Sequence, residues 1–108
     1  MAFKISLTPS YKVKVTVETP NDSNGFDRST FTAEFKRVST DQLDEIQKKT
    51  KKEVVDEVLV GFSDLVDEDN KSVEYNDETR AALLAIPQAV KALADGFLSS
   101  IFNAKEKN

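Results

Sequence analysis

Two segments of the chain alternate strictly between apolar and polar residues. Residues 11–18 place an apolar side chain at every second position, and residues 30–37 repeat the pattern with phenylalanine and alanine. A period of two with β-branched and aromatic residues is typical of a strand with one buried face. Residues 19–25 between them are rich in turn formers. We therefore predict two antiparallel strands joined by a long polar loop, and Phe3, Ile5 and Leu7 alternate in a way that fits a short third strand.

The periodicity changes to a helical one after residue 38. Ser39 and Thr40 are both good N-cap residues, and apolar side chains follow three apart at Leu43 and Ile46. Thr50 and Glu53 have the spacing of a capping box, which indicates a second helix start. Helical spacing then continues through the apolar positions Val54, Val55, Val58, Leu59 and Phe62. The pattern fits either one bent helix or two short ones.

The remaining residues predict a connecting segment and two further helices. Residues 61–75 read as irregular structure or as a small hairpin around residues 67–70. Asn76 is a suitable N-cap for the next helix, and Pro87 is well placed in the first turn of the last one. Residues 104–108 form a polar tail. We predict an α+β fold in one domain, 1–108: a β-hairpin or small antiparallel sheet of two to three strands (about 3–37) followed by three to four α-helices (about 40–104).

The composition excludes most kinds of catalytic site. The 108 residues contain no Cys and no His, which removes thiol nucleophiles, Cys/His zinc sites and imidazole bases. With 19 acidic against 15 basic residues the net charge is −4, whereas a nucleic-acid binder usually presents a basic surface. The chain also has no apolar run of about 20 residues and no signal-peptide pattern. We expect an intracellular protein that is not an enzyme and uses no cofactor, nucleic acid or membrane.

Two charged segments are candidates for binding sites. Residues 67–78 place acidic residues at the first, third and twelfth positions of a calcium loop, but Lys71 and Ser72 occupy positions that need an oxygen ligand and a glycine. We therefore predict a solvated turn and no metal site. The basic residues of 48–52 are flanked by carboxylates and have no interleaved aromatic residue, which favours a solvated helix junction over a phosphate site.

The last predicted helix is the best candidate for a partner-binding surface. Its apolar residues are Val90, Leu93, Ala94, Phe97, Leu98, Ile101 and Phe102. One interpretation is that this face closes the core of the domain. The other is that a small core leaves part of it uncovered for a partner helix or a second subunit. The partner-binding hypothesis names Val90, Leu93, Phe97, Leu98, Ile101 and Phe102.

In order and spacing, several segments resemble a family of tail assembly chaperones of long-tailed phages and prophages. The likeness lies in residues 1–7, 31–37, 56–62 and 67–70, in Ile86-Pro87, and in Lys107-Asn108. It covers nearly the whole chain, although no single piece is a strong motif. The sequence departs from the family at Phe62, where Trp is more usual, and after the acidic turn at Asn70 and Lys71, where Gly is expected.

The resemblance implies a function that the composition alone does not indicate. Proteins of this family act in the host cytoplasm as non-catalytic assembly factors. They bind the long, helical, aggregation-prone tape measure protein and keep it soluble while the tail tube polymerises. The tape measure protein is therefore the expected partner, with the tail tube protein and a second copy of this chain as further candidates. The alternative is a minor tail or tail-completion protein that stays in the virion.

Overall fold

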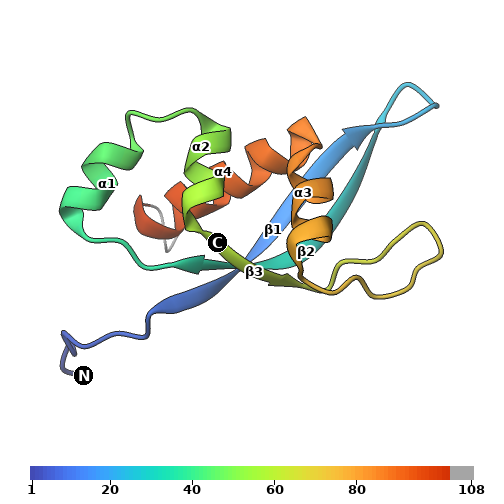
Figure 1. Cartoon of the computed structure of the whole chain (residues 1–108). Helices are drawn as coiled ribbons and strands as arrows, with labels where there is room; N and C mark the ends of the chain where they lie inside the picture. Colours follow the sequence, from blue (N-terminus) through green and yellow to red (C-terminus); the bar gives the residue numbers. More distant parts are fainter. Residues whose placement is uncertain (103–108) are drawn as a thin grey trace.

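Within residues 1–102, three strands and four helices make up an α+β fold, as the sequence predicted (Figure 1). The structure is a computed structural model that describes residues 1–102. The elements in chain order are β1 (Ser10–Pro20), β2 (Phe26–Lys36), α1 (Thr40–Ile46), α2 (Lys51–Val58), β3 (Leu59–Ser63), α3 (Asp77–Leu84) and α4 (Pro87–Phe102). The predicted polar tail, 104–108, lies outside the described residues.

The hairpin of β1 and β2 is longer than predicted, and its loop is shorter. The strands pair antiparallel from Ser10 opposite Lys36 to Pro20 opposite Phe26, which leaves only residues 21–25 as a connection. The Asn21 side chain closes this turn, because its Oδ1 accepts hydrogen bonds from the backbone N–H of Ser23 (2.9 Å) and of Gly25 (3.1 Å). The prediction of a long loop was wrong because these local contacts let pairing continue through polar residues.

The third strand comes from a different part of the chain than predicted. Residues 1–9 form no strand, whereas residues 59–63, which the sequence suggested as a continuation of a helix, form β3 beside β2. The sheet order is β1-β2-β3, with a register shift between Glu34 and Phe35. A short apolar run fits helix or strand equally, and the exposed edge of β2 decides between them. At Gly61 a Cβ atom would approach Glu34 Oε1 to 3.2 Å, so the glycine suits the close pairing.

The helix starts lie where the capping signals placed them. Ser39, Thr50 and Asn76 are N-caps, and each accepts a hydrogen bond from the backbone N–H three residues later. The two starts at Ser39 and Thr50 give two separate helices, which settles the alternative left open by the pattern. Pro87 is the first residue of α4. Local side-chain chemistry therefore fixed where these helices begin.

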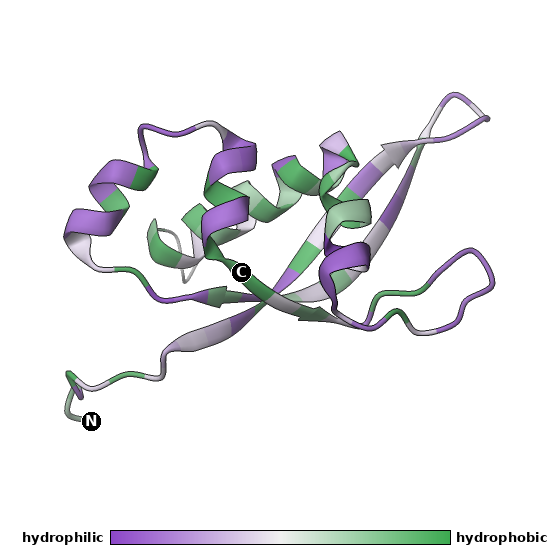
Figure 2. Cartoon of the chain, in the orientation of Figure 1, coloured by the Kyte–Doolittle hydropathy of each residue, from purple (hydrophilic) through white to green (hydrophobic). Residues whose placement is uncertain are grey.

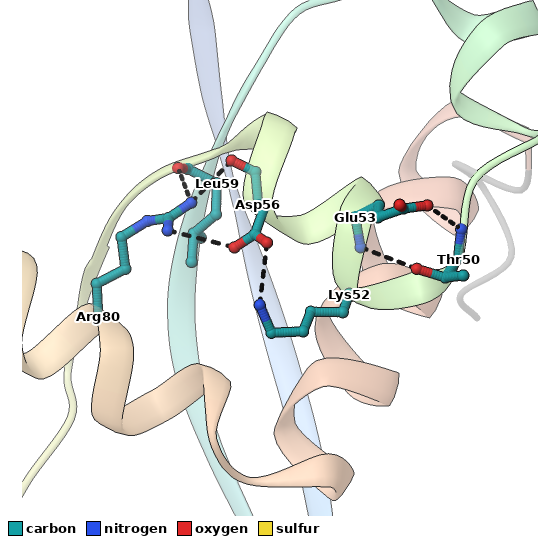
Figure 3. A network of polar contacts seen from close by, with 6 residues as sticks. All are labelled: Thr50, Lys52, Glu53, Asp56, Leu59 and Arg80. Atoms are coloured by element: carbon teal, nitrogen blue, oxygen red, sulfur yellow. Dashed lines mark hydrogen bonds and ion pairs between the residues drawn. The ribbon is translucent and has the colours of Figure 1, made fainter.

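A polar network joins α3 to the point where α2 turns into β3 (Figure 3). The Arg80 guanidinium donates to the backbone carbonyls of Asp56 (2.9 Å) and Leu59 (3.3 Å). Its other nitrogen lies 3.5 Å from Asp56 Oδ1, and Lys52 Nζ lies 3.1 Å from the second carboxylate oxygen. Arg80 thus satisfies carbonyls that the end of α2 leaves unpaired, and this contact secures the change from helix to strand.

The helices of residues 1–102 all lie on one side of the sheet (Figure 1). α4 packs on β1 and contacts β2 through Phe97 and Phe35, and α2 and α3 pack on α4. The core centres on Phe35 of β2 and Phe97 of α4, which are fully buried with ring centroids 5.4 Å apart. Figure 2 shows apolar residues along α4 and β3, and hydrophilic tips on the hairpin and on the loop before α3. The outer face of the sheet carries polar pairs such as Lys12 opposite Glu34.

Asp95 on α4 ties the start of α2 to the last helix. Its carboxylate oxygens lie 2.7 Å from Lys51 Nζ and 2.9 Å from Lys91 Nζ. Partial burial opposes ionisation of Asp95, but the hydrogen bonds and charges of the two lysines outweigh it and lower the pKa of this carboxyl. A carboxyl with a lowered folded-state pKa stabilises the fold above its unfolded-state pKa, and this contribution is lost as the pH falls through the folded-state pKa.

Replacing Phe97 should destabilise the fold strongly. Because the ring is fully buried against Phe35, Phe97→Ala should lower the free energy of unfolding by about 3–5 kcal/mol, measured by urea denaturation followed by circular dichroism. The matched control is Phe102→Ala on the same helix, where the side chain is 55% exposed. The control should change the free energy by no more than about 0.5 kcal/mol. Equal effects of the two variants would contradict the packing of α4.

The contribution of Asp95 should depend on pH. At pH 7 the urea midpoint of Asp95→Asn should lie below that of the unmodified chain, because the amide loses both ion pairs. The difference should shrink as the pH falls from the ordinary pKa of an aspartate, about 3.9, through the lowered folded-state pKa of Asp95. Asp69→Asn, at an exposed turn position, serves as the control for a general change in charge. A difference that persists undiminished at pH 2 would refute the ion-pair assignment.

Candidate partner-binding site

The structure divides the six residues predicted for partner binding into two groups. Val90, Leu93 and Phe97 belong to the buried core. Leu98 and Ile101 are only partly buried, and Phe102 is exposed. A partner cannot reach the first three while the fold is intact, so the hypothesis is corrected to the last turns of α4. The physical reason is that the first three side chains pack in the core between α4, the sheet and the neighbouring helices, whereas Phe102 lies at the end of the helix and is 55% exposed.

A shallow groove opens beside the end of α4, and we call it the end groove. Its apolar lining comes from four separate parts of the chain: Leu7, Val38, Leu43 and Ile101. Leu7 belongs to residues 1–9, Val38 to the link after β2, Leu43 to α1 and Ile101 to α4. Leu98 and Phe102 lie three residues before and one residue after Ile101 on the same helix. The groove therefore gathers apolar surface that the sequence distributes over almost the whole chain.

Polar contacts hold the wall of the end groove in place. Tyr11 Oη and Ser100 Oγ are 2.7 Å apart, which links β1 to α4, and Ser100 Oγ also lies 2.6 Å from the Phe97 carbonyl that accepts its hydrogen bond. The Arg37 guanidinium stacks 4.8 Å from the centre of the Tyr11 ring. Its Nε donates to the Thr8 carbonyl at 2.7 Å. The groove is thus largely pre-formed, which reduces the entropy lost when a partner binds.

Sequence reasoning missed the part of the groove outside α4. Leu43 was assigned only to a helix, and Leu7 to a strand that does not form. The exposure of Phe3, Ile5 and Leu7 is visible only in the structure, because alternation predicts an apolar face without saying whether anything covers it. Leu43 shares α1 with Ile46 at helical spacing, so the pattern predicted a helix and gave no sign of a groove.

The two charged segments behave as solvated structure. Asp67 Oδ1 accepts hydrogen bonds from the backbone N–H groups of Asp69 (2.8 Å) and Lys71 (3.0 Å) and so closes the small hairpin that was one of the predicted alternatives. Within residues 1–102 no three acidic side chains are grouped closely enough to hold a metal ion. The lysines of the basic cluster at 48–52 pair with carboxylates, namely Glu45, Glu57, Asp95 and Asp56. The prediction of a solvated helix junction is confirmed.

No single helix in the described part of the chain is long and apolar enough to cross a membrane. α3 and α4 reach the required length and composition only when taken together, and they meet at an angle of 97°. Their apolar residues, among them Leu83, Leu84 and Leu93, are buried in the core, which accounts for their composition.

Comparison with protein-family models, with curated proteins and with solved structures finds no match for this chain. Only the surface of the molecule and the resemblance to tail assembly chaperones therefore indicate its function.

Proposed function

We propose that this protein is a tail assembly chaperone of a long-tailed phage or prophage. In this proposal it binds the tape measure protein in the host cytoplasm and keeps it soluble while tail tube subunits polymerise around it. The observation that carries the proposal is the end groove, where partly buried Ile101 meets apolar residues from three other segments. Partly buried Leu98 and exposed Phe102 lie on the same end of α4. The resemblance supplies the identity of the partner, and the groove supplies a place for it.

The shape of this surface suits an amphipathic helix. Leu98, Ile101 and Phe102 follow the i, i+3, i+4 spacing of one helix face. A partner helix lying along them would place its own apolar side chains against Leu43 and Val38 in the groove. A tape measure protein, which is long and helical, offers many such faces, and binding would cover the apolar surface that otherwise drives its aggregation.

The small number of apolar side chains at the end groove supports reversible binding. Few apolar side chains contribute, and most are only partly exposed, so a single contact buries less surface than a permanent interface requires. A chaperone that leaves before the tail is complete needs such a contact. Many copies along one tape measure protein would together keep it soluble.

Co-expression with the tape measure protein of the same phage tests the proposal. We expect the two proteins to co-elute in size-exclusion chromatography with light scattering, and the tape measure protein alone to be insoluble. The double variant Ile101→Asp/Phe102→Asp should abolish co-elution, because two carboxylates would have to be buried in the contact. The matched control Val66→Asp changes an exposed valine on the loop after β3 and should retain binding. Circular dichroism confirms that each variant is folded.

Two results would refute the proposal. One is a tape measure protein that is soluble alone and does not bind this chain. The other is the presence of this protein in purified phage particles, detected by mass spectrometry in amounts comparable to known tail subunits, which would favour the alternative of a minor tail or tail-completion protein.

A further inference from the structure

Residues 1–9 form an arm at the start of β1. Thr8 and Pro9 at its root bond to Arg37, and Leu7 lines the end groove, whereas Phe3 and Ile5 are strongly exposed. The apolar side chains of the arm are exposed at 79% for Phe3, 91% for Ile5 and 53% for Leu7. They alternate with Lys4 and Ser6, which is the pattern of a strand with one apolar face. Figure 1 shows the arm leaving the sheet and running away from the helices. A row of exposed apolar residues of this kind usually marks a surface that another molecule covers.

The root of the arm prevents it from folding back on its own sheet. The Arg37 N–H donates to the Pro9 carbonyl at 2.9 Å, which extends the pairing of β1 with β2 by one residue. The Arg37 side chain also donates to the Thr8 carbonyl. These bonds hold the start of the arm in line with β1 and direct it past the end of the sheet. Its apolar face is therefore available to a second molecule.

The outer edge of β1 offers unpaired backbone groups. The hydrogen bonds from Asn21 N–H to the Gly25 carbonyl and from Arg37 N–H to the Pro9 carbonyl show that odd-numbered residues of β1 bond to β2. By the alternation of an antiparallel ladder, the even-numbered residues direct their N–H and C=O groups outward. These residues are Lys12, Lys14, Thr16 and Glu18, and all are exposed. β1 has eleven residues, and the other edge, β3, has only five.

A second groove follows this free edge, and we call it the edge groove. It lies between β1 and one face of α4, and its floor is formed by Val15, Ala92 and Gly96. A Cβ atom at Gly96 would lie 3.5 Å from Val15 Cγ2, so the helix backbone approaches the strand closely there. At one end of the groove lies Phe26, whose side chain is 71% exposed. An added strand would satisfy the backbone of β1 and place alternate side chains against this floor.

We propose that the arm of one copy adds as a fourth strand to β1 of a second copy, with Phe3 and Ile5 in the edge groove. Each copy carries both the arm and the groove. Reciprocal exchange closes as a two-fold symmetric dimer, whereas one-way exchange would build an open filament. The area favours exchange of both arms. The apolar side chains of one arm cover roughly 100–200 Å² each, so one arm in its groove stays near or below the roughly 1,000 Å² of a stable interface. Two arms exceed that area.

The oligomeric state of the purified chain gives the first test. Size-exclusion chromatography with light scattering should give twice the 12.0 kDa of one chain. The variant Phe3→Ser/Ile5→Ser should be monomeric and still folded by circular dichroism, because both side chains are strongly exposed in the single chain. The matched control Val66→Ser removes an exposed apolar side chain elsewhere and should remain dimeric. A monomeric unmodified chain, or a dimer that survives the double substitution, overturns the proposal.

Disulfide trapping identifies where the arm binds. The chain contains no cysteine, so pairs of single-cysteine variants can be mixed and oxidised without interference from native thiols, and mass spectrometry separates the heterodimer from the two homodimers. Ile5→Cys should form a covalent heterodimer with at least one of Gln88→Cys, Ala92→Cys and Ser99→Cys, which lie along the α4 wall of the edge groove. Asp69→Cys, on the exposed turn after β3, is the control partner. If Ile5→Cys forms no more disulfide with the groove variants than with Asp69→Cys, the assignment of the groove is wrong.

The purified chain is sufficient for both experiments. Their failure therefore leaves the test with the tape measure protein unaffected. If the arm substitutions instead weaken binding of the tape measure protein and the unmodified chain is monomeric, the arm belongs to that contact and not to a dimer.

Discussion

The contact between Phe35 and Phe97 is the constraint on which the other features depend. It presses α4 against the sheet, with both rings fully buried and their edges meeting at 5.4 Å between centroids. Burial of two aromatic side chains is among the largest single contributions available to a chain of this size. Once α4 is fixed in this way, α2 and α3 have a surface on which to pack. Asp95 and Arg80 then orient these helices through polar contacts at their ends.

The position of α4 also decides which surfaces remain open. The last turn of the helix is only partly covered, since Ile101 is partly buried and Phe102 exposed, and the end groove opens beside Ile101. The helix runs along β1 without covering its outer edge, and this produces the edge groove above Val15 and Gly96. One helix therefore forms the core, the site proposed for the tape measure protein and the site proposed for the arm of a second copy. Tyr11 and Ser100 join β1 to α4 at the end groove, so the two grooves share one rigid support.

The two proposed contacts would act together in a chaperone. A single end groove offers few apolar side chains to a partner. A reciprocal dimer would present two end grooves on one particle. Two linked weak sites bind a long partner more tightly than either alone when the partner can span both. The arm would at the same time cover the long free edge of β1, which otherwise invites uncontrolled pairing between chains. Acidic net charge adds solubility to the same assembly.

The sequence alone determined the local structure, and the tertiary structure decided exposure and pairing. Capping residues such as Thr50 and Asn76 fixed the helix starts, and alternation identified β1 and β2, because these signals act between residues close in the chain. The strand β3 could not be predicted, since its apolar run also fits a helix and only the free edge of β2 selects the strand. The apolar face of α4 was predicted as a whole, but periodicity cannot tell which of its residues the sheet buries. Burial of Phe97 and exposure of Phe102 follow from where each side chain lies relative to the core, and that is a property of the packed molecule.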